Sequence, residues 1–192
     1  GPPPLVAATA GAIEAMAAEV DHDRVPEEEI RSWFEALNWG ADKIEAEKQA
    51  MRESAHLGYT TEVSIDWSEV TELFESVMRR ARDEFPRAAD LTMLGAHSSH
   101  SYQTGTNLYF VYDYNIDCDP REEITEYHVP LNAIVVEEAL RLGGSMVHHH
   151  GIGKARAKWV HDEYGSSFSM LETLKHAFDP NGIMNAGTII PV

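Results

Sequence analysis

The sequence contains little cysteine, few basic residues and no long apolar run. A single cysteine, Cys118, excludes an internal disulfide framework in this 192-residue chain. Lys and Arg total 15 against 32 Asp and Glu, and the net charge of −17 repels nucleic-acid phosphates and anionic membranes. No apolar run approaches the roughly 20 residues that span a bilayer. We therefore expect a reduced, cytoplasmic protein that does not bind nucleic acid, and nothing in this chain indicates membrane contact.

Glycine-rich phosphate loops are also missing. The first half contains neither a Gly-x-Gly-x-x-Gly fingerprint nor another glycine-rich loop with a strand and a helix around it. The chain opens Gly-Pro-Pro-Pro without an initiator Met, which resembles the remnant left by a tag-removing protease. We interpret residues 1–4 as a tag scar or linker and expect the chain to be a C-terminal piece of a longer protein.

The most informative segment present is residues 143–154, Gly-Gly-Ser-Met-Val-His-His-His-Gly-Ile-Gly-Lys. Glycines at both ends allow positive φ and close approach to a ligand, and neutral imidazole donates, accepts or acts as a base near pH 7. In an extended run His148 and His150 would point one way and His149 the other. We favour catalytic or ligand contact over a metal site or a chance repeat. A metal is not expected, because no cysteine cluster or suitably spaced carboxylate completes a ligand set.

Periodicity predicts an α+β fold with an antiparallel sheet covered by helices, followed by a helical C-terminal segment. The Ala-rich residues 5–20 suit a helix packed on a sheet, a second helix begins after Pro26, and a charged, solvated helix covers 42–54. The remaining predicted elements are strands at 59–65, 90–97 and 107–114, and helices at 68–85, 124–142, 154–160 and 166–178. Pro130 should delay the helix at 124–142. Both faces of the strand at 107–114 are largely apolar, so we expect both to be covered.

Residues 143–154, which we call the histidine loop, resemble the C-terminal part of alkylglycerone-phosphate (alkyl-dihydroxyacetonephosphate) synthase. That family belongs to the vanillyl-alcohol-oxidase-type FAD enzymes. The shared pattern is Gly-Gly-Ser-x-x-His-His-His-Gly-x-Gly-Lys-x-Arg, and it continues through Lys158-Trp159 and the closing Phe-Asp-Pro-Asn-Gly-Ile-Met-Asn-Ala-Gly at 178–187. The resemblance covers residues 91–190 well and 45–90 loosely. Related lactate and glycolate dehydrogenases usually carry Gly-Glu-His-Gly where this chain has His-His-His-Gly, which favours the synthase branch.

The resemblance implies a domain organisation. Residues 5–150 would form a ferredoxin-like cap, the substrate-binding domain, and residues 151–192 a helical segment that packs on a missing N-terminal FAD-binding domain. Without that domain, the segment from about residue 151 is expected to be partly undocked. FAD is the implied cofactor, a small molecule the implied substrate, and a homodimer is possible.

The resemblance also implies roles for individual residues. Tyr114, within Phe-Val-Tyr-Asp-Tyr at 110–114, stands at the position of the family's catalytic tyrosine, and His149 and His150 would join it in proton transfer. Other expected contacts are Arg52, His100, His148 and Lys154 with the substrate, and His150, Gly151 and Asn185 with the cofactor. Flanking His100, His149 and Lys154 are expected to lower the pKa of Tyr114.

Three functions remain open at the level of sequence. The first is the family's exchange of the acyl chain of acyl-dihydroxyacetone phosphate for an alkyl chain, a step of ether-lipid synthesis. The second is an FAD-linked dehydrogenase or oxidase of a small 2-hydroxy acid of the D-lactate or glycolate type, since Asn-Ala-Gly at 185–187 also resembles that branch. The third is a cofactor-free docking domain. We expect the chain alone to be flavin-free and inactive.

Overall fold

The computed structural model describes residues 1–37 and 40–190. Contacts divide the chain into two units, Gly1–Gln49 and Ala50–Val192. The first unit holds α1 (Pro3–Ala17), α2 (Glu27–Ala36) and the beginning of α3 (Ala41–Ser54). As predicted, α2 follows Pro26 and carries three glutamates in its first turn, where they face the positive end of the helix dipole. None of the three helices has a buried residue. The helix expected at residues 5–20 is present, and its packing on a sheet stays a prediction.

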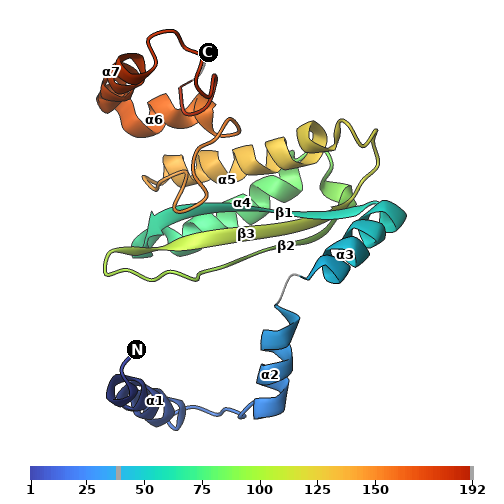
Figure 1. The fold of residues 1–192 in the computed structure, drawn as a ribbon, viewed down its shortest axis with the longest axis vertical. Coiled ribbons are helices and arrows are strands. Elements are labelled where there is room, and N and C mark those ends of the chain that lie inside the picture. Colours follow the sequence, from blue (N-terminus) through green and yellow to red (C-terminus); the bar gives the residue numbers. More distant parts are fainter. Residues whose placement is uncertain (38–39, 191–192) are drawn as a thin grey trace. The chain divides into compact units, whose positions relative to one another are not determined.

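The second unit is built on a three-stranded sheet formed by β1 (His56–Asp66), β2 (Leu91–His97) and β3 (Gly105–Asn115). The strand order is β1-β3-β2, and β3 runs antiparallel to both neighbours. Helix α4 (Val70–Glu84) connects β1 to β2, and α5 (Val129–Arg141) follows β3 (Figure 1). This split βαβ arrangement confirms the α+β prediction of an antiparallel sheet covered by helices.

One face of the sheet carries the core. Val63, Phe110 and Tyr112 of the strands are fully buried against α4 and α5. The helices contribute Leu73 and Val77 of α4 and Leu131, Ile134, Val135 and Ala139 of α5. Each fully buried large apolar side chain stabilises the fold by about 1.5–3 kcal/mol.

The other face of β3 differs from the prediction. Tyr109, Val111 and Asp113, which alternate with the core residues, are only half-buried. The expectation that both faces are fully covered therefore holds for one face only. We call the half-buried side, with Thr60 and Glu62 of β1 and Tyr109 of β3, the open face.

Helix α5 starts late, as Pro130 predicts. Residues Ile124–His128 form a π-helical turn, and regular α-helix begins at Val129 with Pro130 in its first turn. A proline is tolerated there because the first amides of a helix have no partner in it.

The C-terminal segment is partly docked. Trp159, which ends the turn Ala157–Trp159, and Val160, which begins α6 (Val160–Tyr164), are buried against Val136 of α5 and Met146. Helix α7 (Phe168–Phe178) has no buried residue, and Phe178 is 81% exposed. Residues 157–160 are thus docked on the core of the second unit, whereas α7 keeps an apolar surface uncovered.

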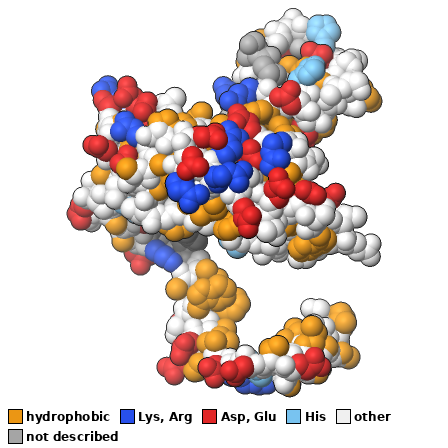
Figure 2. All heavy atoms as spheres, turned by 180° about the vertical axis from the view of Figure 1, so that it is seen from behind, with side chains coloured by type: hydrophobic (Ala, Val, Ile, Leu, Met, Phe, Trp, Pro, Cys, Tyr) orange, Lys and Arg blue, Asp and Glu red, His pale blue; other side chains and the backbone are white. Residues whose placement is uncertain are grey.

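Basic and acidic side chains are interspersed on the face seen in Figure 2, and the basic ones do not form a separate patch there. Arg80 of α4 forms ion pairs with Glu84, Glu137 and Glu138, and two of these acids belong to α5. The pairs tie the two core helices together. Within the described residues, no helix has both the length and the apolarity needed to cross a membrane.

Candidate active site

The histidine loop reaches the open face because glycines let it run beside β1. Gly143 ends α5 with a φ of +77°, a conformation that favours glycine. Ser64 and Ser145 then exchange two backbone hydrogen bonds, with N to O distances of 3.0 and 2.9 Å. A side chain on Gly144 would place its Cβ 2.4 Å from the carbonyl oxygen of Ser64. Close backbone packing at this glycine therefore carries the following three histidines onto the sheet.

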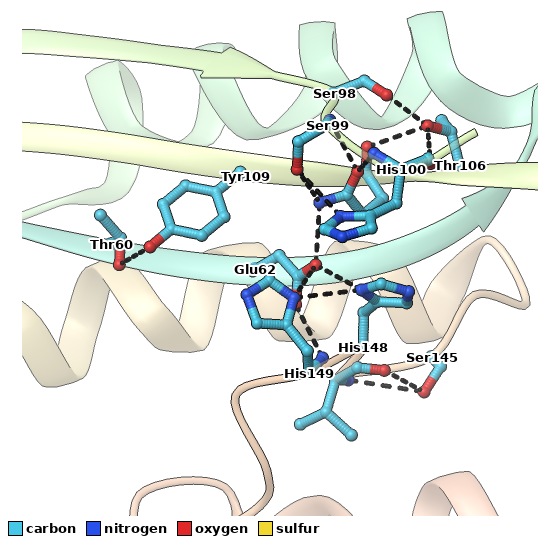
Figure 3. A network of polar contacts seen from close by, with 12 residues as sticks. Thr60, Glu62, Ser98, Ser99, His100, Thr106, Tyr109, Ser145, His148 and His149 are labelled. Atoms are coloured by element: carbon cyan, nitrogen blue, oxygen red, sulfur yellow. Dashed lines mark hydrogen bonds and ion pairs between the residues drawn. The ribbon is translucent and has the colours of Figure 1, made fainter. Parts of the chain in front are cut away.

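Glu62 of β1 is the centre of the site. Its neighbour Val63 points into the core, so Glu62 points to the open face, where it is fully buried beneath the histidine loop. Its Oε1 accepts hydrogen bonds from Asn107 Nδ2 at 2.9 Å and His148 Nδ1 at 2.8 Å and lies 2.9 Å from His149 Nδ1. Its Oε2 accepts a bond from the His149 amide at 3.2 Å (Figure 3).

These partners keep Glu62 ionised. Burial by itself would raise the pKa of Glu62, but the hydrogen bonds from Asn107 and the His149 amide, together with the charges of His149 and His148, bring that pKa below its ordinary value. The site therefore holds a fixed negative charge at neutral pH. Two imidazoles face this charge directly.

Asn107 positions the chain after β2. Its Oδ1 accepts hydrogen bonds from the amides of Ser99 and His100, at 3.0 and 2.9 Å. His100 consequently lies near the histidine loop, with its ring centroid 4.9 Å from that of His148. The hydroxyl of Tyr102 bonds to His148 Nε2 at 2.7 Å. The structure thus brings His100, His148 and His149 together. The expectation that His149 points away from His148 is wrong, because Nδ1 of each of these two lies within 2.9 Å of Glu62 Oε1.

Tyr109 of β3 joins the site beside Glu62, its partner in the β1–β3 register. Thr60 donates a hydrogen bond to the Tyr109 hydroxyl at 3.1 Å. The Tyr109 ring lies 5.1 Å from that of His150 and 6.1 Å from that of His149. Burial lowers the pKa of His150, which favours its neutral form. Tyr109 and His150 form a pair of proton-carrying groups on the open face.

Tyr114 lies on the opposite, helix-covered face. It is fully buried, donates a hydrogen bond to Glu123 and stacks on Tyr127 with ring centroids 4.4 Å apart. Burial first, and then Glu123, raise the pKa of Tyr114 well above its ordinary value, so the expected lowering by histidines is wrong. The structure does not bring Tyr114 to the histidine loop, and a catalytic role for it finds no support in the geometry.

Arg52 also lies apart from the histidines. It is exposed near the end of α3, beside a cavity of about 400 Å³ that Leu57 and Cys118 also line. Leu57 and Glu62 are five positions apart on β1, which corresponds to about 17 Å of strand. A substrate group held by Arg52 would be distant from the imidazoles.

The other expected contacts follow the loop. Lys154 is exposed just after it, and Gly151 adopts a φ of +76°. Asn185 lies in the segment after α7 with a φ of +47°. That segment returns toward the loop, because the Ile189 amide donates to the Gly153 carbonyl at 3.3 Å. Their predicted substrate and cofactor contacts stay predictions.

Sequence analysis missed four residues of the site: Glu62, Asn107, Tyr109 and Arg156. An acid inside a run of β-formers was a signal for Glu62. Arg156, only 5% exposed, donates to the carbonyl oxygens of Glu62 and Met146, at 2.9 and 2.5 Å, and to Asn132 Oδ1 at 3.3 Å. It ties the histidine loop to β1 and α5. The shared Gly-Lys-x-Arg pattern was the only signal for it.

A polar recess of about 340 Å³ opens beside His148. Its walls include Asp66, Tyr102, Thr104 and Ser145, and no Lys or Arg is among the described residues that line it. The recess provides hydroxyl groups, backbone amides and one carboxylate next to the imidazoles.

The chain belongs to the family of FAD linked oxidases, of which it matches the C-terminal domain over residues 10–189. It is 57% identical over 183 residues to the uncharacterized FAD-linked oxidoreductase YgcU of Escherichia coli K12, covering 95% of this chain and 38% of that protein. It is 26% identical over 140 residues to alkyldihydroxyacetonephosphate synthase of Caenorhabditis elegans, covering 71% of this chain and 23% of the relative.

Among solved structures, an alkyldihydroxyacetonephosphate synthase aligns with a TM-score of 0.44 at 17% identity, covering 74% of this chain and 24% of that chain. The chain therefore spans about two fifths or less of the length of these relatives. The expected FAD-linked family and its FAD cofactor are confirmed, whereas the synthase-like function stays a prediction.

Proposed function

We propose that this chain supplies the substrate-facing part of an FAD-dependent oxidoreductase that oxidises a hydroxyl-bearing carbon of a small molecule. The observation that carries the proposal is the group of imidazoles and Tyr109 on the open face, beside a polar recess. The flavin, bound with the help of the rest of the protein, supplies the two-electron redox chemistry.

The open face suits the approach of a flat ring system. Tyr109 is half-buried and His150 is exposed, so both rings are accessible there. Nothing lies within 4 Å of the position that a Cβ on Gly151 would occupy, so the backbone beside His150 is unhindered. Tyr109, His150 and Gly151 are the residues we assign to contact with the flavin and the reacting carbon.

The protein groups would move the substrate proton. Thr60 donates to the Tyr109 oxygen, which leaves the phenol proton free for a partner in the site. Neutral His150 can accept a proton from a substrate hydroxyl at neutral pH. Glu62 holds His148 and His149 in fixed orientations. Positioned acid–base groups of this kind contribute about 10²–10⁴-fold to a rate.

The second candidate is the exchange of an acyl for an alkyl chain on acyl-dihydroxyacetone phosphate. The His-His-His-Gly sequence and the similarity to alkyldihydroxyacetonephosphate synthases favour it. The lining of the recess provides no described Lys or Arg for a phosphate. A phosphorylated substrate would need a cation from another part of the protein, and we therefore rank this candidate second.

Anaerobic mixing of the full-length, FAD-loaded protein with candidate substrates tests the proposal. Loss of the oxidised flavin absorbance with uncharged small alcohols is expected, whereas a 2-hydroxy acid, like a phosphorylated substrate, would need a cation from another part of the protein. His150→Ala should slow that loss, and Lys48→Ala, on the exposed side of α3, should not. Incorporation of a labelled fatty alcohol into acyl-dihydroxyacetone phosphate, without flavin reduction by any hydroxyl compound, would instead establish the exchange reaction.

A further inference from the structure

We propose that Glu62, His100, His148 and His149 form a binding site for a divalent transition-metal ion of the Zn²⁺ type. One ligand atom from each side chain lies within 4.8 Å of every other. The four residues come from β1, the segment after β2 and the histidine loop, so only the folded chain assembles them. The sequence-based argument against a metal, that no carboxylate completes the set, fails because Glu62 supplies one.

Three of the ligand atoms already have nearly the spacing of a coordination sphere. Glu62 Oε1 lies 2.8 Å from His148 Nδ1 and 2.9 Å from His149 Nδ1, and the two nitrogens are 3.1 Å apart. Zinc bonds of 2.0–2.1 Å in a tetrahedral site place neighbouring ligand atoms about 3.3 Å apart. Expansion of this triangle by a few tenths of an ångström would accommodate the ion.

Hydrogen bonds alone cannot make all three contacts among Glu62 Oε1, His148 Nδ1 and His149 Nδ1 attractive. A carboxylate oxygen only accepts, and each ring nitrogen either carries one hydrogen or presents one lone pair. If both nitrogens are protonated, the 3.1 Å contact between them joins two donors; if only one is, the other turns a lone pair toward Glu62. No assignment makes all three contacts attractive. A cation between the three atoms does, because all of them then act as electron-pair donors.

The surrounding groups orient these ligands as outer-shell partners orient metal ligands elsewhere. Asn107 donates to Glu62 at 2.9 Å and fixes the His100 amide through its Oδ1. With Nδ1 of His148 on the metal, its Nε2 would carry the hydrogen and donate to the Tyr102 hydroxyl at 2.7 Å. Ser99 contacts His100 Nδ1 at 3.0 Å, which leaves Nε2 of that ring for the ion.

The donor set selects the class of ion. Three imidazoles and one carboxylate, without a thiolate, suit Zn²⁺ and neighbouring first-row ions, whereas Ca²⁺ and Mg²⁺ prefer oxygen ligands. His148 also lines the polar recess, so a substrate hydroxyl there could approach the ion. Tyr109 and His150 lie outside the ligand set and stay available for proton transfer. The metal site does not depend on the proposed function.

The test is metal content and affinity of the untagged 192-residue chain. The chain is stripped with a chelator, loaded with Zn²⁺ alone, desalted and measured by elemental analysis, and its affinity is measured by competition with a chromophoric chelator. We expect about one tightly held Zn²⁺ per chain. His149→Ala and Glu62→Gln should each weaken binding by about 100-fold or more, since losing an outer-shell partner alone costs 10–100-fold.

His97→Ala is the matched control, because His97 stacks on Tyr109 at 5.0 Å but is not one of the four proposed ligands. It should leave Zn²⁺ affinity unchanged. Far-UV circular dichroism checks folding, and the exposed His100 and His149 carry the test if buried Glu62→Gln does not fold. Two results would overturn the site: no Zn²⁺ retained by the folded chain, or retention that His100→Ala and His149→Ala both leave unchanged. Neither result depends on flavin turnover.

Discussion

At the scale of single residues, the face of β3 on which a side chain lies decides what it can do. Tyr109 and Tyr114 are five positions apart, an odd number, so they point to opposite faces of the sheet. The first contacts the histidines, and the second is fixed in the core by Glu123 and Tyr127. Two tyrosines on one strand therefore have separable roles.

Tyr109→Phe in the full-length, FAD-loaded enzyme should reduce turnover by about 10²–10⁴ with little change in substrate affinity, because it removes a proton-carrying hydroxyl. Tyr114→Phe should keep most of the turnover and lower the free energy of unfolding by about 1–3 kcal/mol, since buried Glu123 loses its donor. Steady-state kinetics and urea unfolding measure both effects. The reverse pattern of turnover would restore Tyr114 as the catalytic tyrosine.

Glu62 predicts a specific pH dependence of stability. Its pKa is lower in the folded chain than in the unfolded chain, so its carboxylate stabilises the fold above the unfolded pKa of about 4.3. That contribution is lost as the pH falls through the lower folded value. In metal-free buffer, Glu62→Gln should lower the free energy of unfolding by about 2 kcal/mol at pH 7. This difference in stability from the parent chain should shrink as the pH falls below 4.

Urea unfolding at a series of pH values measures that difference. The control is Glu75→Gln on the exposed side of α4, which should change the free energy of unfolding by no more than about 0.5 kcal/mol throughout. A cost for Glu62→Gln that is constant down to pH 3 would show that its charge does not contribute to stability.

At the scale of elements, the site depends on how the histidine loop is fastened to β1. The bridge between Ser64 and Ser145 fixes the start of the loop, and Arg156 fixes its end to the carbonyl oxygens of Glu62 and Met146. Either fastening can be removed without touching a histidine.

Gly144→Ala should lower the free energy of unfolding by about 1–3 kcal/mol through overpacking. Its Cβ would meet the Ser64 carbonyl oxygen at 2.4 Å and Ile65 Cδ1 at 2.7 Å, and the loop would have to move. Gly95→Ala in β2 is the control, because nothing lies within 4 Å of its Cβ position. Equal stability of the two variants, measured by urea unfolding, would show that the close approach at Gly144 is not required.

Arg156→Ala should lower the free energy of unfolding by about 3 kcal/mol, because it leaves two buried carbonyl groups and Asn132 without their charged donor. Lys158 is exposed, and its ammonium group lies 3.9 Å from the Trp159 ring centroid. Lys158→Ala should therefore lower the free energy of unfolding by about 1 kcal/mol or less. Imidazole NMR signals of the histidine loop should shift in the Arg156 variant and not in the Lys158 variant. Unshifted signals in both would contradict a positioning role for Arg156.

At the scale of the whole molecule, the chain matches the C-terminal domain of the FAD-linked oxidases. Its open face is a surface that the rest of such a protein can cover. The exposed apolar side chains of α7, such as Met170, Leu174 and Phe178, fit the same interpretation. We propose that the flavin-binding part of the protein covers these surfaces.

The chain alone should accordingly purify without flavin and take up no added FAD, because its sequence contains no dinucleotide-binding loop. The full-length protein is the control and should show the visible absorbance of bound flavin. Retention of FAD near one equivalent by the 192-residue chain would show that it contains a flavin site of its own.

The sequence by itself determined the order and type of the main elements, since alternation predicted the strands and the 3.6-residue period predicted helices α4 and α5. It also identified the histidine loop and, through the residues around it, the FAD-linked family. These properties are encoded locally, within single segments of the chain.

Only the tertiary structure decided which face of the sheet stays open and which residues meet there. Glu62 and His148 are 86 positions apart, and Arg156 bonds to the Glu62 carbonyl from 94 positions away. Alternation shows which side chains of a strand share a face but not which face the helices cover. Tyr114 and Arg52 were therefore placed in the site by resemblance alone, and Glu62, Asn107 and Tyr109 emerged only when the chain brought distant segments together.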